Sequence, residues 1–301
     1  MAARRLRHDT PGKPVVPSSP ATIDLHTHTA RSDGLLEPAS LVAAVAATGV
    51  RLLAITDHDT LAGVREVLAA GAVPPGLELL PGIELNAVTD RPDLRESEVH
   101  LLGLGVDPDD DELETALSLQ RERRRARFEL MVAKLASIGR PIDDALETFS
   151  AISDDDALGR PRVARAMIAK GYVTSVEEAF ELFLSRGRAG YVPREGIGPI
   201  EAIRVIRAAG GLASLAHFSE ASYRPDVIHE LQDAGLAGLE VYYRTFDAPT
   251  VAAMRAVAKR TGLIATGGTD YHGDRDTYAE AHAALDIPRA VGDRLRAALG
   301  H

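Results

Sequence analysis

The sequence of 301 residues contains no cysteine. This absence excludes disulfide bonds, and it also excludes thiolate ligands for a bound metal ion. Any metal must therefore be held by imidazole and carboxylate groups, a ligand set that suits Mn, Fe or Zn. The remaining composition is that of an ordinary globular protein, and its length fits one elaborated domain better than several independent modules.

Long apolar runs and an excess of positive charge are also absent. No apolar run approaches the roughly 18 residues of a membrane span. Residues 1–20 are basic and then rich in Pro and Ser, which is typical of a disordered leader rather than a secretory signal. We therefore expect a cytoplasmic protein that does not bind membranes.

The net charge of −10 bears on the kind of ligand. Nonspecific binding of duplex nucleic acid needs a continuous basic surface, so we expect no stable binding of that kind. A small phosphorylated substrate is compatible with this charge, because divalent cations and a few arginines can dominate the field inside one cleft.

From residue 21 the sequence alternates short apolar runs with helical stretches, which favours parallel strands joined by crossover helices. About seven strands are expected, one fewer than in a regular eightfold barrel. Residues 107–190 interrupt this alternation with a mostly helical pattern. We predict an α/β fold: a distorted seven-stranded (β/α) barrel over 21–106 and 191–301, with a helical insertion domain over 107–190 that caps the substrate site. The expected strands are 23–25, 52–56, 77–85, 99–106, 212–216, 236–242 and 263–266.

Nine side chains of types that bind divalent metals lie at or beside the expected strands. Each has a separate structural explanation, such as a core histidine, a turn or an ion pair. Strand ends meet on one face of an α/β barrel, however, so groups from distant parts of the sequence converge there. Their coincidence with strand ends predicts a multinuclear metal site. The nine residues are His26, His28, Asp33, His58, Glu84, His100, His217, Asp270 and His272.

Six short motifs carry eight of these residues, all except His100, in a fixed order. They are Asp24-Leu25-His26-Thr27-His28, Asp33-Gly34, Thr56-Asp57-His58-Asp59, Pro81-Gly82-Ile83-Glu84, Ala216-His217 and Gly268-Thr269-Asp270-Tyr271-His272. Together they resemble the ordered motifs of the polymerase and histidinol phosphatase (PHP) family of metal-dependent phosphoesterases, over roughly residues 22 to 285. The strongest likeness is to stand-alone enzymes that act as 3′-phosphatases on nucleoside 3′,5′-bisphosphates or as 5′-3′ exonucleases on short RNA. Those enzymes have a distorted seven-stranded barrel and a helical insertion at the place of residues 107–190.

The resemblance implies three divalent metal ions per chain, of which Mn is the best candidate. His26, His28, Glu84 and Asp270 would hold the first ion. Glu84, His100 and His217 would hold the second, and Asp33, His58 and His272 the third. In the implied reaction a hydroxide bridging two ions attacks phosphorus, with Glu84, Asp270 and His272 as catalytic residues. The general acid stays open among His272, Asp57 and a metal-bound water.

Arginines are the other groups expected to contact phosphate. The segment 159–162 is similar to a Gly-Arg-Pro-His segment of the family, which implies that Arg160 contacts phosphate. Arg162 replaces the usual His. Arg194 ends a segment similar to a family Tyr-Val-Pro-Lys segment and is the second candidate, although either arginine could instead form a surface ion pair. The basic run 121–127 has acidic residues at helical spacing, which predicts a solvated helix face.

Two alternatives to a phosphoesterase are considered. An amidohydrolase-type C–N hydrolase also uses His-x-His and a late Asp on a barrel, but it usually needs a carbamylated Lys after the fourth strand, where this sequence has none. An inert metal-binding module would have lost ligands, whereas all nine are present. Phe218 and the segment 241–244 depart from the family pattern and are expected to line the substrate pocket. The choice between a nucleotide and a short oligoribonucleotide as substrate therefore stays open. The sequence also leaves the oligomeric state open.

Overall fold

The computed structural model describes residues 21–94, 97–146 and 156–300. The predicted leader, residues 1–20, lies outside this part. Seven strands form one sheet in the order in which they follow along the chain, β1 to β7. The sheet nearly closes on itself, because the Leu25 N–H donates to the Gly267 carbonyl at 3.2 Å and Thr27 pairs with Tyr271 in a parallel bridge. The predicted distorted seven-stranded barrel is thereby confirmed.

Most neighbouring strands are parallel, as the alternating pattern predicts, but β4 runs antiparallel to both of its neighbours. The expectation of a parallel arrangement is wrong for this strand. No helix separates β3 from β4 in the described residues, and a short connection without a crossover returns the chain in the opposite direction. The strands are β1 (Ile23–Asp24), β2 (Leu52–Ile55), β3 (Glu78–Val88), β4 (Glu98–Leu104), β5 (Leu212–Leu215), β6 (Gly238–Tyr243) and β7 (Ile264–Gly268).

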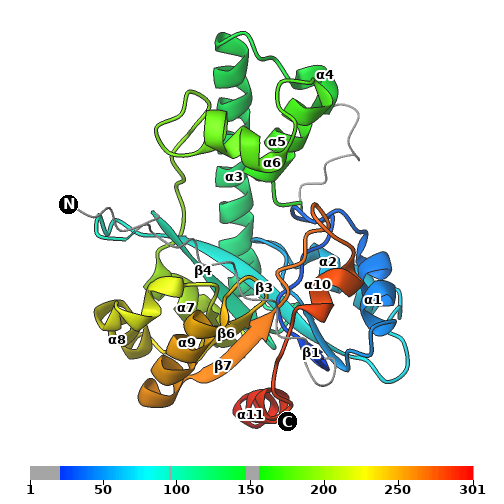
Figure 1. Cartoon of the computed structure of the whole chain (residues 1–301), viewed down its shortest axis with the longest axis vertical. Coiled ribbons are helices and arrows are strands. Elements are labelled where there is room, and N and C mark those ends of the chain that lie inside the picture. The colour runs from blue at the N-terminus through cyan, green and yellow to red at the C-terminus, as the bar shows by residue number, and fades with distance from the viewer. Residues whose placement is uncertain (1–20, 95–96, 147–155, 301) are drawn as a thin grey trace, which may run out of the picture.

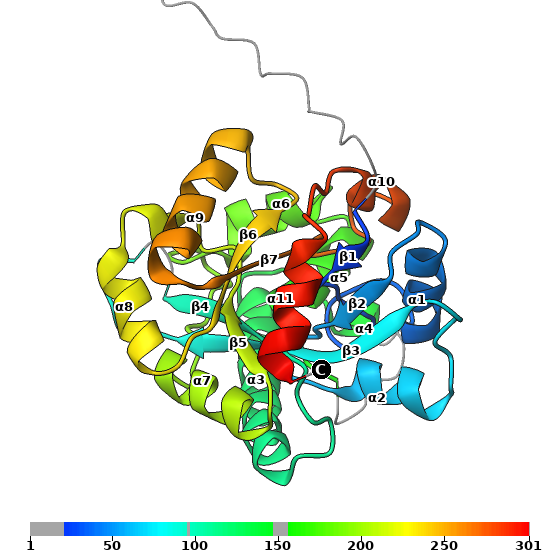
Figure 2. The same ribbon diagram turned by 90° about the horizontal axis from the view of Figure 1, so that it is seen from below.

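Helices surround the sheet and close its lower end (Figures 1 and 2). Four of them begin with Pro in the first turn, where the missing N–H costs no hydrogen bond. The last helix packs Val291 and Leu295 against the apolar ends of β1 and β2. Around the barrel lie α1 (Pro38–Ala46), α2 (Ala62–Ala69), α7 (Pro199–Ala208), the 3-10 helix η2 (Ser219–Ser222), α8 (Pro225–Asp233), α9 (Ala248–Thr261), α10 (Tyr278–Ala283) and α11 (Ala290–Leu299).

The segment between β4 and α7 is helical in the described residues and projects from the upper end of the barrel (Figure 1). Its helices pack around a hydrophobic core of their own, which includes Phe128, Leu135 and Met167. α5 reaches back to the barrel, where Arg165 donates to the carbonyl of Asp33 at 2.6 Å. The elements are α3 (Asp111–Ser137), α4 (Asp143–Leu146), α5 (Arg160–Ala169), α6 (Val176–Ala179) and the π-helix η1 (Phe180–Leu184).

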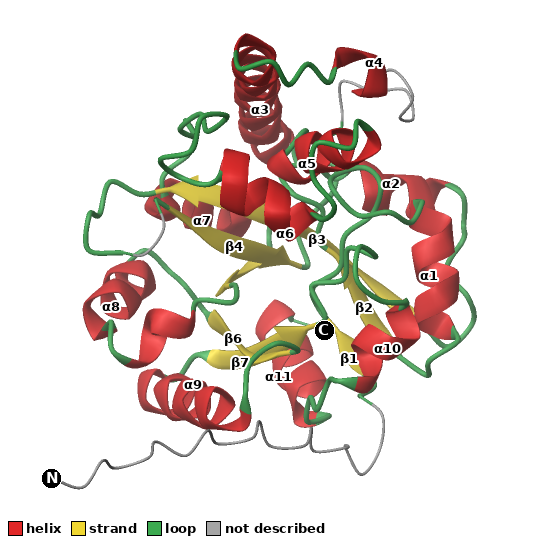
Figure 3. Cartoon of the chain, turned by 45° about the horizontal axis from the view of Figure 1, so that its top comes forward, coloured by secondary structure: helices red, strands yellow, loops and turns green. Residues whose placement is uncertain are grey.

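The two ends of the barrel therefore differ. At the lower end, apolar side chains of the strands pack against α11. At the upper end, α5 and α6 lie over the loops that follow the strands (Figure 3). Any polar site of the barrel is accordingly expected at the upper end.

Among the described residues, no helix is both long and apolar enough to cross a membrane.

Candidate metal centre

A single buried carboxylate occupies the middle of the site. Glu84 lies in β3 with no exposed side-chain surface, and five histidine nitrogens lie 2.9 to 3.3 Å from its two oxygens. These histidines follow different strands or belong to them, so the strand ends do converge as predicted. They are His26, His28, His58, His100 and His217.

A second carboxylate completes the first predicted group. The Asp270 Oδ1 atom lies 3.1 Å from His28 Nε2 and 3.3 Å from His26 Nε2. Together with Glu84, these residues offer four ligand atoms that all lie within 4.8 Å of one another. That spacing allows one ion to contact all four.

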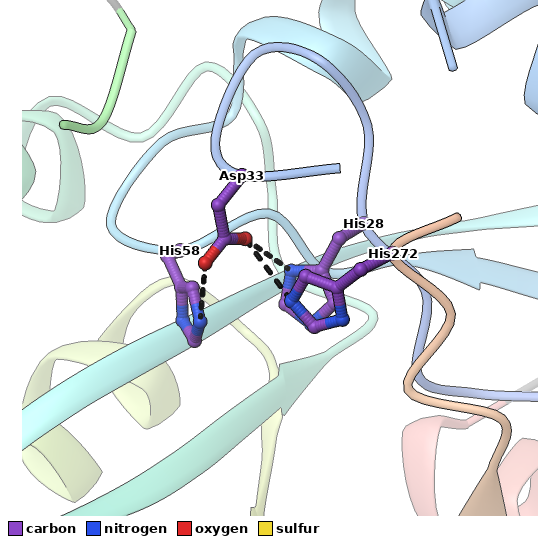
Figure 4. Close-up of side chains that lie close together, drawn as sticks. All are labelled: His28, Asp33, His58 and His272. Atoms are coloured by element: carbon purple, nitrogen blue, oxygen red, sulfur yellow. Dashed lines mark ion pairs between the residues drawn. The ribbon is translucent and has the colours of Figure 1, made fainter. Parts of the chain in front are cut away.

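A third carboxylate, Asp33, gathers three histidines on the other side of His28 (Figure 4). Its oxygens lie 3.1 Å from His272 Nε2, 3.6 Å from His58 Nε2 and 3.8 Å from His28 Nδ1. These four residues form a second group whose ligand atoms lie within 4.8 Å of one another. The predicted third set of Asp33, His58 and His272 is thus assembled, with His28 added to it.

The groups share ligands more than the sequence suggests. His58 presents Nδ1 to Glu84 and Nε2 to Asp33, and it joins Glu84 and His100 in a third group. His28 likewise presents one nitrogen to Asp33 and the other to Glu84. All nine predicted residues therefore lie in one continuous cluster.

Several polar atoms of this cluster are buried without a hydrogen-bond partner. They are His26 Nε2, both ring nitrogens of His28, His58 Nδ1 and Glu84 Oε2. Burying such atoms without a partner is costly, and a divalent cation would satisfy them together. Imidazole and carboxylate are also suitable ligands for transition-metal ions. The residues present therefore fit a multinuclear metal site.

The charges of the carboxylates favour cations as well. Burial alone would raise the pKa of Glu84 and Asp270, but the surrounding histidines lower both values well below the usual range. Burial lowers the pKa of His58 to about 4, despite the attraction of Glu84 and Asp33, which leaves a neutral imidazole. For His28 burial acts in the same direction, yet Asp270 and Glu84 raise its pKa to about 10. A metal ion must therefore displace a proton from His28.

The backbone is strained at the same place. Among the described residues, the non-glycine residues with positive φ are Asp59 at 50°, His217 at 30° and Asp270 at 48°. Such conformations are costly for side chains other than glycine and persist where the surrounding structure holds them. Two of these residues belong to the cluster, which suggests that strain is accepted here to orient ligands.

A layer of hydrogen bonds orients the cluster from behind. Glu240 lies 3.1 Å from His26 Nδ1 and accepts the His217 N–H at 2.7 Å. The Tyr243 hydroxyl donates to Asp270 Oδ2 at 2.8 Å. Asp57, considered above as a general acid, accepts hydrogen bonds from Thr29 and Ser32 and so orders the turn after β1.

A second cluster of charged groups adjoins the metal centre. Arg160 and Arg194 each lie 2.9 Å from the Glu98 carboxylate, which is 9% exposed. The predicted phosphate-binding arginines do form ion pairs, but with a largely covered carboxylate rather than a fully exposed one. These two arginines, with Arg124, Arg127, Glu98 and Asp59, are called the arginine cluster below.

Two members of the arginine cluster come from α3. Arg124 and Arg127 are only 6% and 7% exposed, and Arg121 is similarly buried. The interpretation of residues 121–127 as a solvated helix face is therefore wrong for these three. Arg124 pairs with Asp59, and the Arg127 Nε–H donates to the Val192 carbonyl at 2.9 Å.

The arginine cluster holds four guanidinium groups and two carboxylates. Burial and the neighbouring arginines lower the pKa of Arg194 to about 10, and the same causes lower the pKa of Arg127 to about 10. Burial would raise the pKa of Glu98, but Arg194, His100 and Arg160 lower it to about 2. Positive charge is in excess, so the cluster is suited to an anion.

Asn86 connects the two clusters. The side-chain nitrogen Nδ2 of Asn86 lies 2.6 Å from His100 Nε2, while the side-chain oxygen Oδ1 of the same residue accepts a hydrogen bond from Arg124. Glu98 and His100 also lie on the same face of β4, two residues apart. A cluster suited to cations and a cluster suited to an anion thus lie side by side. The roles of Asn86, Arg124 and Arg127 were not predicted from the sequence, and neither was the hydrogen bond from Tyr243, whose segment 241–244 was expected only to line the substrate pocket.

Comparisons with known proteins agree with this geometry. The family model described as the PHP domain matches residues 24–195, which is more than half of the chain. The chain is 32% identical over 274 residues to a 3′,5′-nucleoside bisphosphate phosphatase from Chromobacterium violaceum, covering 89% of this chain and 93% of that protein. The chain belongs to the PHP family. It is also 33% identical over 257 residues to the 5′-3′ exoribonuclease Rnm from Escherichia coli, covering 83% of this chain and 84% of that protein.

Two solved structures share the fold of this PHP protein. An amidohydrolase from Chromobacterium violaceum with bound sulfate and no metal superposes with a TM-score of 0.79 and 29% identity, covering 92% of this chain and 97% of the other. A metal-dependent phosphoesterase from Bifidobacterium adolescentis gives the same TM-score with 26% identity, covering 94% and 98%. The PHP protein described here is therefore a metal-dependent hydrolase of phosphate esters, as the resemblance of its motifs implies.

Proposed function

We propose that this PHP enzyme hydrolyses phosphate esters of nucleotides, as a 3′-phosphatase of nucleoside 3′,5′-bisphosphates, as a 5′-3′ exonuclease on short RNA, or as both. One observation carries this proposal: the metal centre and the arginine cluster lie side by side and share Asn86. A substrate with two phosphate groups a few bonds apart could place one group in each. The phosphatase and the exoribonuclease named above act on substrates of this kind.

The nine clustered residues are proposed to hold three divalent ions, with manganese as the preferred metal. When bound, such ions neutralise charge on the phosphoryl oxygens and provide a nucleophile at neutral pH. Glu84 contacts at least one histidine of each group and is assigned the bridging position. Asp270 and His272 face the cavity next to the centre and are assigned to the reacting phosphate.

The other residues bind and orient the substrate. Arg160 and Arg194 are assigned to the phosphate that is not cleaved, because guanidinium groups bind phosphate with two parallel hydrogen bonds. Glu98 holds both arginines in place before the substrate arrives. Tyr243 and Glu240 keep Asp270, His26 and His217 in the orientation that ligation needs.

Residues 107–190 are proposed to act as the substrate cap. Arg124, Arg127 and Arg160 all belong to this segment, so it supplies most of the positive charge of the arginine cluster. A barrel without the segment would keep the metal ligands and lose the second anion site. A cytoplasmic location and small phosphorylated substrates stay predictions.

Purified protein loaded with Mn²⁺ tests the proposal. Release of phosphate from adenosine 3′,5′-bisphosphate and of mononucleotides from 5′-phosphorylated trinucleotide RNA would be measured side by side. We expect turnover of at least one substrate. Arg204→Ala alters an exposed arginine that pairs with Glu112 and Glu201, outside the arginine cluster, and this control variant should keep full activity. Turnover of amides without turnover of either phosphate ester would contradict the proposal and favour C–N hydrolysis.

A further inference from the structure

A cavity of about 590 Å³ opens beside Asp270 and His272 of the metal centre. Its volume lies within the roughly 300 to 1,000 Å³ of typical small-molecule sites. Phe180 and Ser185 line it from the helical segment, and Tyr243 and Arg244 line it from the barrel. The cavity therefore lies between the proposed cap and the catalytic end of the barrel.

Two aromatic side chains in this lining are held in place. Phe180 begins the π-helix η1, in which the Ser185 N–H donates to the Phe180 carbonyl at 3.0 Å. π-helices are rare in proteins, and those that occur are often found at functional sites. The Arg160 guanidinium lies 5.1 Å from the centre of the Phe180 ring. Tyr243 is fixed by its hydrogen bond to Asp270 and by the ring of Phe246, 5.0 Å away.

Away from the edge formed by Asp270 and His272, which are assigned to the reacting phosphate, the charge of the lining disfavours a second phosphate. Glu177, Glu181 and Asp274 contribute carboxylates, of which Asp274 pairs with Arg165 at 2.7 Å, and the arginines that line the cavity already have carboxylate partners. Arg275 lies 2.8 Å from Glu177, and Arg244 lies 2.6 Å from Asp276. This is the reverse of the arginine cluster, where positive charge is in excess. The part of the substrate that enters this cavity should accordingly be uncharged.

We propose that this cavity binds the nucleobase of the substrate, which stacks on Phe180 and Tyr243. The inference rests on the proposed function, because it assumes a nucleotide substrate. Stacking on aromatic rings is available to every base, so the cavity would favour nucleotides over sugar phosphates without selecting strongly among the bases. Phe180 and Tyr243 are specificity-determining residues in this account.

The test compares adenosine 3′,5′-bisphosphate with its abasic analogue, 1-deoxyribose 3,5-bisphosphate. Stacking gives about a 10- to 100-fold preference in kcat/KM for the nucleotide in the natural protein. Phe180→Leu keeps an apolar side chain but removes one of the two rings, so the preference should fall at least about threefold, mainly through KM, while Phe180→Trp should retain it. Phe180 carries the test because variants of Tyr243 also disturb Asp270.

Leu182→Ala is the matched control, since Leu182 lies in the same π-helix, is 48% exposed and is not part of the cavity lining. It should leave both substrates unaffected. Equal losses on both substrates in Phe180→Leu would show a structural role and overturn the inference. A natural protein that hydrolyses both bisphosphates equally well would overturn the inference and leave the proposed function intact, whereas one that hydrolyses neither would remove both.

Discussion

The metal centre and the arginine cluster are both buried groups of charged side chains, yet they are opposite in what they lack. The metal centre has three carboxylates and several ring nitrogens with no hydrogen-bond partner, so it is complete only with cations. The arginine cluster has four guanidinium groups around Glu98 and Asp59, so it is complete only with an anion. The proposed phosphate site is thus a local excess of positive charge in a protein with a net charge of −10.

The two clusters also differ in origin. The metal ligands lie in or after the strands of the barrel, where the sheet fixes their positions. The arginines come mainly from α3, α5 and the segment that returns to the barrel. Under the proposed function, the difference teaches that the barrel would supply the chemistry, while residues 107–190 would decide the choice of substrate.

The largest effect is expected from Glu84→Ala. Because Glu84 contacts ligands of all three groups, its loss should reduce bound metal and lower kcat by more than the roughly 100-fold that substitutions behind a metal site can cost. Metal content by mass spectrometry and phosphate release would be measured together. Glu78→Ala, on the same strand but at the surface, is the control and should keep both.

Glu98→Gln should destabilise the protein in a pH-dependent way. The pKa of Glu98 is about 2 in the folded protein against 4.5 ordinarily, which corresponds to about 3 kcal/mol of folding free energy at pH 7. Because the pKa of the Glu98 carboxyl is lowered, its charge stabilises the folded protein fully above pH 4.5, and this stabilisation is lost as the pH falls towards 2. Urea unfolding at several pH values should show a difference from the natural protein that shrinks in that range; a constant difference would disagree.

Arg194→Ala should separate the two clusters functionally. Hydrogen bonds to charged groups contribute about 1.5 to 3 kcal/mol, so KM for adenosine 3′,5′-bisphosphate should rise roughly 10- to 100-fold. Metal content should not change, because Arg194 contacts Glu98 and Asp59 rather than the ligands. A loss of metal in this variant would mean that the clusters are not distinct.

Tyr243→Phe is expected to have the smallest effect of the four. It removes only the hydroxyl that donates to Asp270, and substitutions in this layer weaken metal binding about 10-fold. Titration with Mn²⁺ would measure the affinity, and thermal unfolding of the metal-free protein should be nearly unchanged. Unchanged affinity would show that the hydrogen bond does not orient Asp270.

The sequence predicts the barrel well, and it predicts which ligand-type side chains lie together, because both follow from local pattern. Buried strands are short apolar runs, and His26, Glu84 and Asp270 are placed by the ends of such runs. The antiparallel direction of β4 depends instead on the absence of a crossover helix. The sharing of His58 between Asp33 and Glu84 depends on three-dimensional distances that no spacing encodes.

The arginine cluster was harder to predict, although a signal exists. Leu113, Leu117, Arg121, Arg124 and Arg127 recur at intervals of three or four residues, so the arginines continue the buried stripe of α3. Acidic neighbours at helical spacing favour a solvated helix face. Because these neighbours are numerous, the sequence pattern predicts a solvated face instead of a continued buried stripe. The burial of the arginines becomes evident only in the structure, where Arg124 pairs with Asp59 and Arg127 donates a hydrogen bond to the Val192 carbonyl.

The most direct test is anomalous diffraction from crystals grown with Mn²⁺ and inorganic phosphate. We predict manganese peaks between Glu84, Asp270 and Asp33, and phosphate density against Arg160 and Arg194. Crystals with no manganese peak within coordination distance of Glu84, at millimolar Mn²⁺, would contradict the claim that this buried carboxylate is the centre of a metal cluster.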